Sequence, residues 1–191
     1  MQHSSGTWEA RTRAVKTKGR QHGVHGGNEV AVFLSTFTNK IDRKGRVSVP
    51  APFRTAIERI GPPKVFVLRS FKYPCLEGWS EERVTQIVNA IDQYPVFSEE
   101  AEIYNDLLAE LRELSIDGDG RILVPEEFRD HAGLGETATF AGLGKSFQIW
   151  EPEAHAGRRE ASRAKIRDGG LSLPLGPSGN GGGSSGGGGQ T

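Results

Sequence analysis

The chain has 191 residues, enough for one or two compact domains, and its 24 basic side chains equal its 24 acidic ones. A net charge of zero argues against a histone-like protein held to its partner by bulk charge, but it leaves room for a local basic patch. A single cysteine, Cys75, excludes a disulfide framework and a multi-cysteine zinc site, and no apolar run approaches the roughly 20 residues that span a bilayer.

The first segment, residues 1–31, carries basic side chains among Gly, Ser, His and Thr, with almost no apolar periodicity. Such a composition predicts a disordered basic arm. Its basic residues are Arg11, Arg13, Lys16, Lys18 and Arg20. Because no apolar run follows them, they do not form a secretory signal, and we expect a soluble, cytoplasmic protein.

Residues 32–79 are predicted to form a first β-rich half. An alternating run over residues 33–39 predicts a strand, and a second strand ends at Pro50. Between the two strands, Asp42 can bond backbone N–H groups and Gly45 can supply the positive φ of a tight turn. A short helix after the proline and a further β-rich segment complete this half.

Residues 80–114 are predicted to connect the two halves through two helices. Ser80 can cap the first helix, whose apolar positions have helical spacing. The second helix begins near Ser98 and is expected to bury five apolar side chains, which are Ile103, Leu107, Leu108, Leu111 and Leu114.

Residues 115–167 repeat the first half. Residues 41–54 and 116–129 share the template I-D-x-x-G-R-[VI]-x-V-P-x-x-F-R, with eight of 14 positions identical at a constant offset of 75. Chance would give about one match, so an internal duplication is the better explanation. A last, more polar helix is expected to end near Arg167, and a flexible glycine-rich tail is expected over residues 168–191.

The charges around the first turn need a separate explanation. Four basic residues crowd around Asp42, and a purely structural turn does not require their mutual repulsion; they are Lys40, Arg43, Lys44 and Arg46. A phosphate backbone would relieve that repulsion, and Asp42 is spaced to brace the guanidinium of Arg46. The alternative is that Asp42 and Arg46 form only a fold-stabilising salt bridge across a hairpin.

The second turn departs from this pattern. Gly118 and Asp119 replace the two central basic residues, so this turn is net acidic. If the motif contacts DNA, the first copy should therefore dominate. Arg121 remains a candidate contact with Asp117 as its brace, and a purely structural salt bridge between these two residues remains the alternative.

An enzyme is the least favoured class. Asp42, Asp117 and Asp119 could be imagined as a carboxylate site, but no serine, cysteine or histidine has the setting of a nucleophile. No two histidines are spaced as metal ligands within the folded part, and the G-x-G of residues 142–144 is better explained as a hairpin turn. We expect no catalysis, no cofactor, no metal and no small-molecule substrate.

Over about residues 32–167 the chain resembles the MraZ family. The resemblance rests on two D-x-x-G-R elements, at residues 42–46 and 117–121, each followed by an apolar strand and a proline, and on the closing sequence Phe147-Gln148-Ile149-Trp150. It implies an α+β fold of tandem AbrB-like swapped-hairpin β-barrel halves, with pseudo-twofold symmetry and flanking helices. It also implies a homo-oligomeric ring that binds short repeats in the double-stranded promoter DNA of the division and cell-wall gene cluster, usually as a repressor.

The resemblance places the DNA-contacting loop on residues 42–46, with Arg46 as the first candidate, in a cytoplasmic and nucleoid-associated protein. Members of the family usually begin close to Phe33, so one hypothesis is that translation starts at Val32, and the other is a real basic arm that adds non-specific DNA affinity. The competing function is an oligomeric β-scaffold, or an antitoxin-like module that binds a protein partner through residues 80–93 and 98–114.

Overall fold

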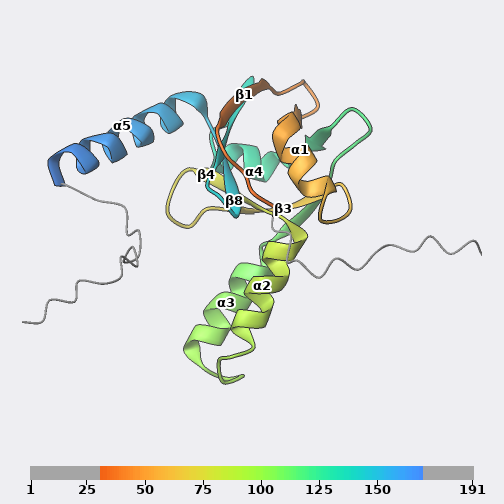
Figure 1. Cartoon of the computed structure of the whole chain (residues 1–191), viewed down its shortest axis with the longest axis vertical. Helices are drawn as coiled ribbons and strands as arrows, with labels where there is room; N and C mark the ends of the chain where they lie inside the picture. Colours follow the sequence, from red (N-terminus) through yellow and green to blue (C-terminus); the bar gives the residue numbers. More distant parts are fainter. Residues whose placement is uncertain (1–30, 170–191) are drawn as a thin grey trace, which may run out of the picture.

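A computed structural model describes residues 31–169 as an α+β protein (Figure 1). Residues 1–30 of the expected arm and residues 170–191 of the expected tail lie outside the described part of the chain. Ala31, the last residue of the expected arm, is buried in the core, so the arm was expected to extend one residue too far. The strands are β1 (Thr36–Lys40), β2 (Arg46–Ser48), β3 (Lys64–Arg69), β4 (Cys75–Trp79), β5 (Arg112–Ser115), β6 (Arg121–Leu123), β7 (Thr137–Gly142) and β8 (Ser146–Trp150). The helices are α1 (Ala51–Glu58), α2 (Glu81–Ile91), α3 (Glu99–Ala109), α4 (Glu126–His131) and α5 (Pro152–Gly169).

The two halves of the sequence give the same order of elements. Each runs strand, strand, helix, strand, strand, helix, so that β1 corresponds to β5, β2 to β6, α1 to α4, β3 to β7, β4 to β8 and α2 to α5. Helix α3 is inserted between the halves and has no counterpart. This order fits the duplication that the repeated motif predicts.

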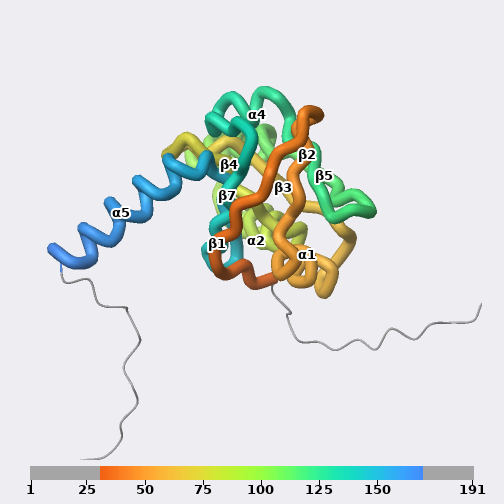
Figure 2. Tube along the Cα trace, turned by 90° about the horizontal axis from the view of Figure 1, so that it is seen from above, coloured from red at the N-terminus to blue at the C-terminus, as the bar shows by residue number. Residues whose placement is uncertain are grey.

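The strands of the two halves are interleaved (Figure 2). One antiparallel sheet has the strand order β1-β7-β8-β4-β3-β5, and β2 pairs with β6 in a separate two-stranded ribbon. Exchanging every strand for its counterpart reproduces the same order read backwards. The first strand of each half pairs with the third strand of the other half, so neither half completes its hydrogen bonding alone.

The strands that flank the first turn scarcely pair with each other. An isolated bridge between Ile41 and Val47 joins them, and beyond it β1 pairs with β7 while β2 pairs with β6. The alternating pattern fixes which face of a strand is buried but not which strand lies beside it. The extended run also begins later than expected, at Thr36, because Ser35 has a φ of 72° that interrupts the strand conformation.

A cluster of phenylalanines forms the centre of the core. Phe53 of α1 lies 5.1 Å from Phe33 and 5.5 Å from Phe147 between ring centroids, and all three are fully buried. Val47 and Ile122, the central residues of the ribbon, are also 0% exposed. The core thus closes against the inner face of the ribbon and leaves its other face to solvent.

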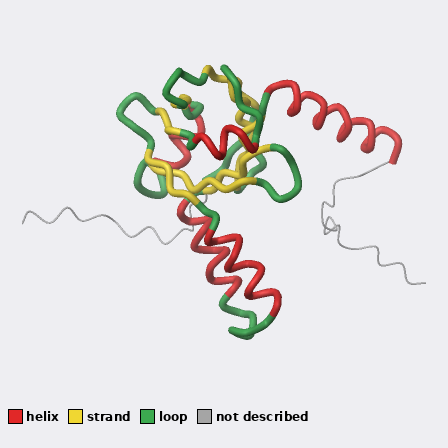
Figure 3. Tube along the Cα trace, turned by 180° about the vertical axis from the view of Figure 1, so that it is seen from behind, coloured by secondary structure: helices red, strands yellow, loops and turns green. Residues whose placement is uncertain are grey.

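Helices α2 and α3 project from the body as a pair (Figure 3). Ser80 caps α2 as predicted, accepting a hydrogen bond from the backbone N–H of Arg83 at 3.3 Å. Ser98 caps α3 in the same way, accepting from the N–H of Ala101 at 3.2 Å. Each cap satisfies one of the backbone donors left free in a first helical turn.

The expected extent of the second connecting helix is wrong. Helix α3 ends at Ala109, and Leu114 lies buried in strand β5. The expected burial of Ile103 is also wrong, because this residue is 58% exposed. Short apolar runs fit a helix or a strand equally well, and here the free edge of β3 selects a strand.

Helix α5 leaves the body near Trp150 and buries no residue (Figure 1). It continues to Gly169, so the helix includes the first two residues of the segment expected to be a flexible tail. Within residues 31–169 no helix combines the length and apolarity that a membrane crossing requires.

Candidate nucleic-acid interface

The first motif folds around the carboxylate of Asp42. Its Oδ1 accepts hydrogen bonds from the backbone N–H groups of Lys44 and Arg46, both at 2.9 Å. The N–H of Gly45 donates to the carbonyl of Asp42 at 2.9 Å, and Gly45 has a φ of +83°. Asp42 therefore closes the turn, and glycine supplies the left-handed residue that the turn requires.

The same carboxylate holds the side chain of Arg46. Oδ2 of Asp42 accepts from Nε at 2.7 Å and lies 2.7 Å from Nη2, while both side chains remain about one-third exposed, at 36% and 35%. The pKa of Asp42 is lowered to about 2, mainly because the backbone N–H of Arg46 stabilises the charged form, with further contributions from the Arg46 side chain and the N–H of Lys44. Arg46 is thus fixed in direction before any partner arrives.

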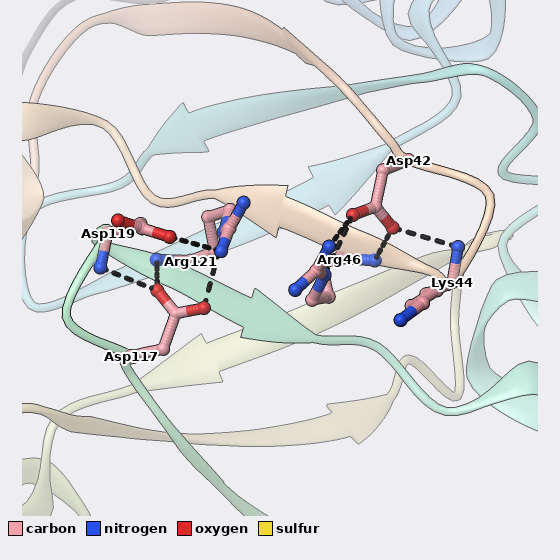
Figure 4. A network of polar contacts seen from close by, with 6 residues as sticks. All are labelled: Asp42, Lys44, Arg46, Asp117, Asp119 and Arg121. Atoms are coloured by element: carbon pink, nitrogen blue, oxygen red, sulfur yellow. Dashed lines mark hydrogen bonds and ion pairs between the residues drawn. The ribbon is translucent and has the colours of Figure 1, made fainter.

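The second motif repeats this geometry with one addition (Figure 4). Oδ1 of Asp117 accepts from the N–H groups of Asp119 and Arg121, both at 2.9 Å, and Oδ2 accepts from Nε of Arg121 at 3.2 Å. Nη2 of Arg121 also pairs with Asp119. The hydrogen bond to Asp117 raises the pKa of Arg121, and the Arg121 N–H lowers that of Asp117. Two acids therefore neutralise Arg121, whereas one neutralises Arg46.

The ribbon places both arginines on one face. Arg46 lies opposite Leu123, and Ser48 lies opposite Arg121. Residues directly opposite in an antiparallel pair share a face, as do residues two apart in one strand. Because Val47 and Ile122 fill the buried face, Arg46 and Arg121 both lie on the outer one (Figure 4).

The remaining predicted basic residues lie around the first turn. Lys40 ends β1, and Arg43 and Lys44 lie in the turn itself; all three are exposed. Within the described residues none of these side chains has an ion pair. Their counterparts in the second half are Ser115, Gly118 and Asp119, so of the two turns only the first is basic.

Two arginines that were not predicted as site residues, Arg54 and Arg129, lie against the glycines of the two turns. A Cβ on Gly45 would lie 3.1 Å from the guanidinium carbon of Arg129, and one on Gly120 would lie 2.8 Å from that of Arg54. Each arginine belongs to one half, and its guanidinium lies against the turn glycine of the other half. Both close the repeated template at the same offset, which is the signal that could have identified them.

The described residues contain no group of three or more His, Cys, Asp or Glu side chains able to hold a metal ion. Cys75 is buried, and burial raises the pKa of its thiol to about 12, which removes the thiolate that a nucleophile needs. What the ribbon presents is two arginine side chains held by carboxylates.

Fold and site together define a duplicated α+β protein that presents two carboxylate-held arginines on an exposed β-ribbon. The chain belongs to the MraZ family. The model of that family, described as "MraZ protein, putative antitoxin-like", matches residues 32–106 and again residues 107–164.

Several relatives share most of the chain. The protein named Transcriptional regulator MraZ from Gluconobacter oxydans (strain 621H) is 42% identical over 142 residues, which cover 72% of this chain and 87% of the relative. Proteins of the same name are 38% identical in Gluconacetobacter diazotrophicus, over 76% of this chain and 93% of the relative, and 37% identical in Azorhizobium caulinodans, over 78% and 94%. The matched residues therefore account for nearly the whole length of these relatives.

Proposed function

We propose that this protein is a sequence-specific DNA-binding transcriptional regulator. It represses the division and cell-wall gene cluster by binding short repeats in the promoter, in the cytoplasm and at the nucleoid. The family membership and the printed names of the relatives support the regulatory role. The observation that carries DNA binding is the pair of fixed arginines on the outer face of the β2–β6 ribbon.

A two-stranded ribbon with arginines on its outer face suits a DNA groove. The major groove of B-DNA admits a two-stranded β-ribbon, and a guanidinium can donate two hydrogen bonds to one guanine edge. Arg46 is better suited to this task than Arg121, because it has a single neutralising acid and its loop is otherwise basic. In this proposal Arg46 reads bases, and Lys40, Arg43 and Lys44 bind phosphates.

The interleaved strands support the finer description of the fold. We assign the arrangement to tandem AbrB-like swapped-hairpin halves of one barrel, the first running from β1 to α2 and the second from β5 to α5, with α3 between them. A pseudo-twofold axis would pass near the paired residues Val47 and Ile122. A ring of several copies would then present several loops to several promoter repeats, and this multivalency would compensate for the weak binding of a single loop.

The test is binding to DNA from upstream of the protein's own gene, with a scrambled fragment as control, at several salt concentrations. Wild type should bind its own fragment more tightly, and binding should weaken with salt. Arg46→Ala should abolish the preference while the circular dichroism spectrum and melting temperature stay close to those of wild type. Equal binding of both fragments by wild type would rule out sequence-specific regulation.

A second candidate rests on the helical hairpin. Val96 and Phe97, between α2 and α3, are 78% and 93% exposed, and apolar side chains presented in this way are typical of protein-binding surfaces. They favour an oligomeric scaffold, or an antitoxin-like module that binds a protein partner. Such a protein would show no preference for its own promoter and no dependence on Arg46, so the same binding experiment distinguishes the two functions.

A further inference from the structure

A hollow of about 370 Å³ opens beside the first turn, where the two halves meet. Lys40 and Arg43 line it from the first half, and Arg129, Glu136 and Thr137 line it from the second. At this point a backbone hydrogen bond joins the two halves: the N–H of Ile41 donates to the carbonyl of Glu136 at 2.8 Å. The hollow is therefore a product of the folded chain and belongs to neither half alone.

Arg129 lacks a partner in this hollow. Its Nε is buried without a hydrogen bond, and among residues 31–169 its guanidinium makes no hydrogen bond or ion pair. Its counterpart Arg54 differs, because Nη1 of Arg54 donates to the carbonyl of Val49 at 2.6 Å. A partly buried guanidinium without an acceptor is costly, and an anion with several oxygens would satisfy it.

The charges around the hollow favour such an anion. Three cations line it, and of the two acids Asp42 is already neutralised by Arg46 at 2.7 Å. Glu136, the other acid, is exposed, so solvent screens its charge. The net charge of the lining is therefore positive, which is complementary to the negative charge of a phosphate group.

The second half contains no equivalent of this arrangement. Ser115 and Gly118 stand in the positions of Lys40 and Arg43. The corresponding strand start carries Lys64, but its amine is held by Glu81 at 2.9 Å and Glu113 at 3.1 Å. The cationic hollow is thus a one-sided feature of an otherwise symmetric ribbon.

We propose that this hollow binds one phosphate of the DNA backbone, with Arg129, Arg43 and Lys40 as its donors. This inference rests on the proposed function, because DNA is the source of phosphate that would lie beside Arg46. A backbone phosphate held at one end of the ribbon fixes the register and the direction of the protein on the duplex. Base reading by Arg46 then follows from a position already set.

The test measures binding to the specific and the scrambled fragment across a salt series, for wild type, Arg129→Gln and Arg43→Gln. Lys145→Gln is the matched control, because Lys145 is exposed and follows β7 at the end opposite Thr137. Each neutralised phosphate contributes about 0.9 to the slope of log affinity against log salt. Arg129→Gln and Arg43→Gln should each reduce the slope by about that amount and weaken both fragments by the same factor, while Lys145→Gln should leave the slope unchanged.

The outcomes separate this inference from the proposed function. A wild type that prefers its own fragment, together with unchanged slopes for Arg129→Gln and Arg43→Gln, would overturn the phosphate site and leave the regulator intact. Equal binding of both fragments with reduced slopes would retain the site and remove sequence-specific regulation. If Arg129→Gln proves unfolded by circular dichroism, Arg43→Gln decides alone, since the exposed Arg43 side chain makes no hydrogen bond or ion pair within residues 31–169. An unchanged slope for Arg43→Gln then overturns the inference.

Discussion

Each motif aspartate satisfies the backbone of its turn and holds the arginine that follows. At Asp42 both functions meet in one carboxylate, whose two oxygens divide the N–H groups and the guanidinium between them. Losing the charge of this carboxylate would loosen the turn and the direction of Arg46 together. The pair is one-third exposed, so its importance lies in geometry more than in stability.

This coupling predicts a pH dependence. The pKa of Asp42 is about 2 in the folded protein against an ordinary value of 3.8, so the folded state favours the charged form. The stability that the pair supplies should be complete above pH 3.8 and should be lost as pH falls toward about 2. Urea unfolding of wild type and Asp42→Asn should show a difference at pH 6 that shrinks below pH 4. A difference that stays constant down to pH 2.5 would contradict this account.

The sequence predicted the residue pairs of the site but not what lies beneath them. Asp42 with Arg46 and Asp117 with Arg121 follow from spacing within one turn, which is local information. Arg54 and Arg129 support the turns only because the halves cross, and the distance along the chain between each arginine and its glycine is long. Their positions depend on strand pairing that no local pattern specifies.

At the scale of the elements, the β2–β6 ribbon and the helices α1 and α4 form one structural unit. Strand β2 leads through Pro50 into α1, and β6 leads through Pro125 into α4, so each helix carries its arginine under the opposite turn. The turn glycines must therefore satisfy two conditions, a positive φ and space for a guanidinium. The strands, turns and helices of the two motifs were predictable from proline, glycine and the alternation of apolar residues. The strand conformation of Leu114 was not predictable, because β5 forms only by pairing with the edge of β3.

Gly45→Ala should consequently destabilise the protein. Its left-handed backbone alone costs about 1–2 kcal/mol, and the new Cβ would crowd the guanidinium of Arg129 at 3.1 Å. Gly118→Ala is the matched control, because Gly118 does not have a positive φ and no atom lies within 4 Å of its added Cβ. Urea denaturation should show a loss for Gly45→Ala and a change within about 0.5 kcal/mol for Gly118→Ala. Equal effects would mean that the turn conformation is not the constraint.

At the scale of the whole molecule, the strand arrangement is symmetric, whereas the charges of the two turns are not. The strand order is unchanged when the halves are exchanged, yet the first turn carries exposed cations and the second turn is acidic. A duplicated scaffold of this kind can dedicate one copy of the motif to binding and use the other to complete the fold. The projecting pair α2–α3 and the extended α5 then remain available for contacts with other chains (Figure 1).

Adding charge to the second turn should therefore extend the binding surface. Gly118→Arg is sterically open and restores a residue type found at the equivalent position, Arg43. We expect a steeper salt dependence and tighter binding to both specific and scrambled DNA. Gly157→Arg on α5, which is also sterically open, adds the same charge away from the ribbon. Identical steepening by both variants would show that overall charge, and not the ribbon, governs binding.

In the proposed function, Arg46 reads a base. The most direct measurement replaces each guanine of the promoter fragment in turn with 7-deazaguanine, which removes the N7 acceptor, and compares wild type with Arg46→Ala. At one guanine of each repeat, wild type should lose binding free energy within the roughly 1–3 kcal/mol that a bidentate arginine contact supplies, and Arg46→Ala should lose nothing further there. If Arg46→Ala remains as sensitive as wild type at every guanine, then Arg46 does not read a base and the account is contradicted.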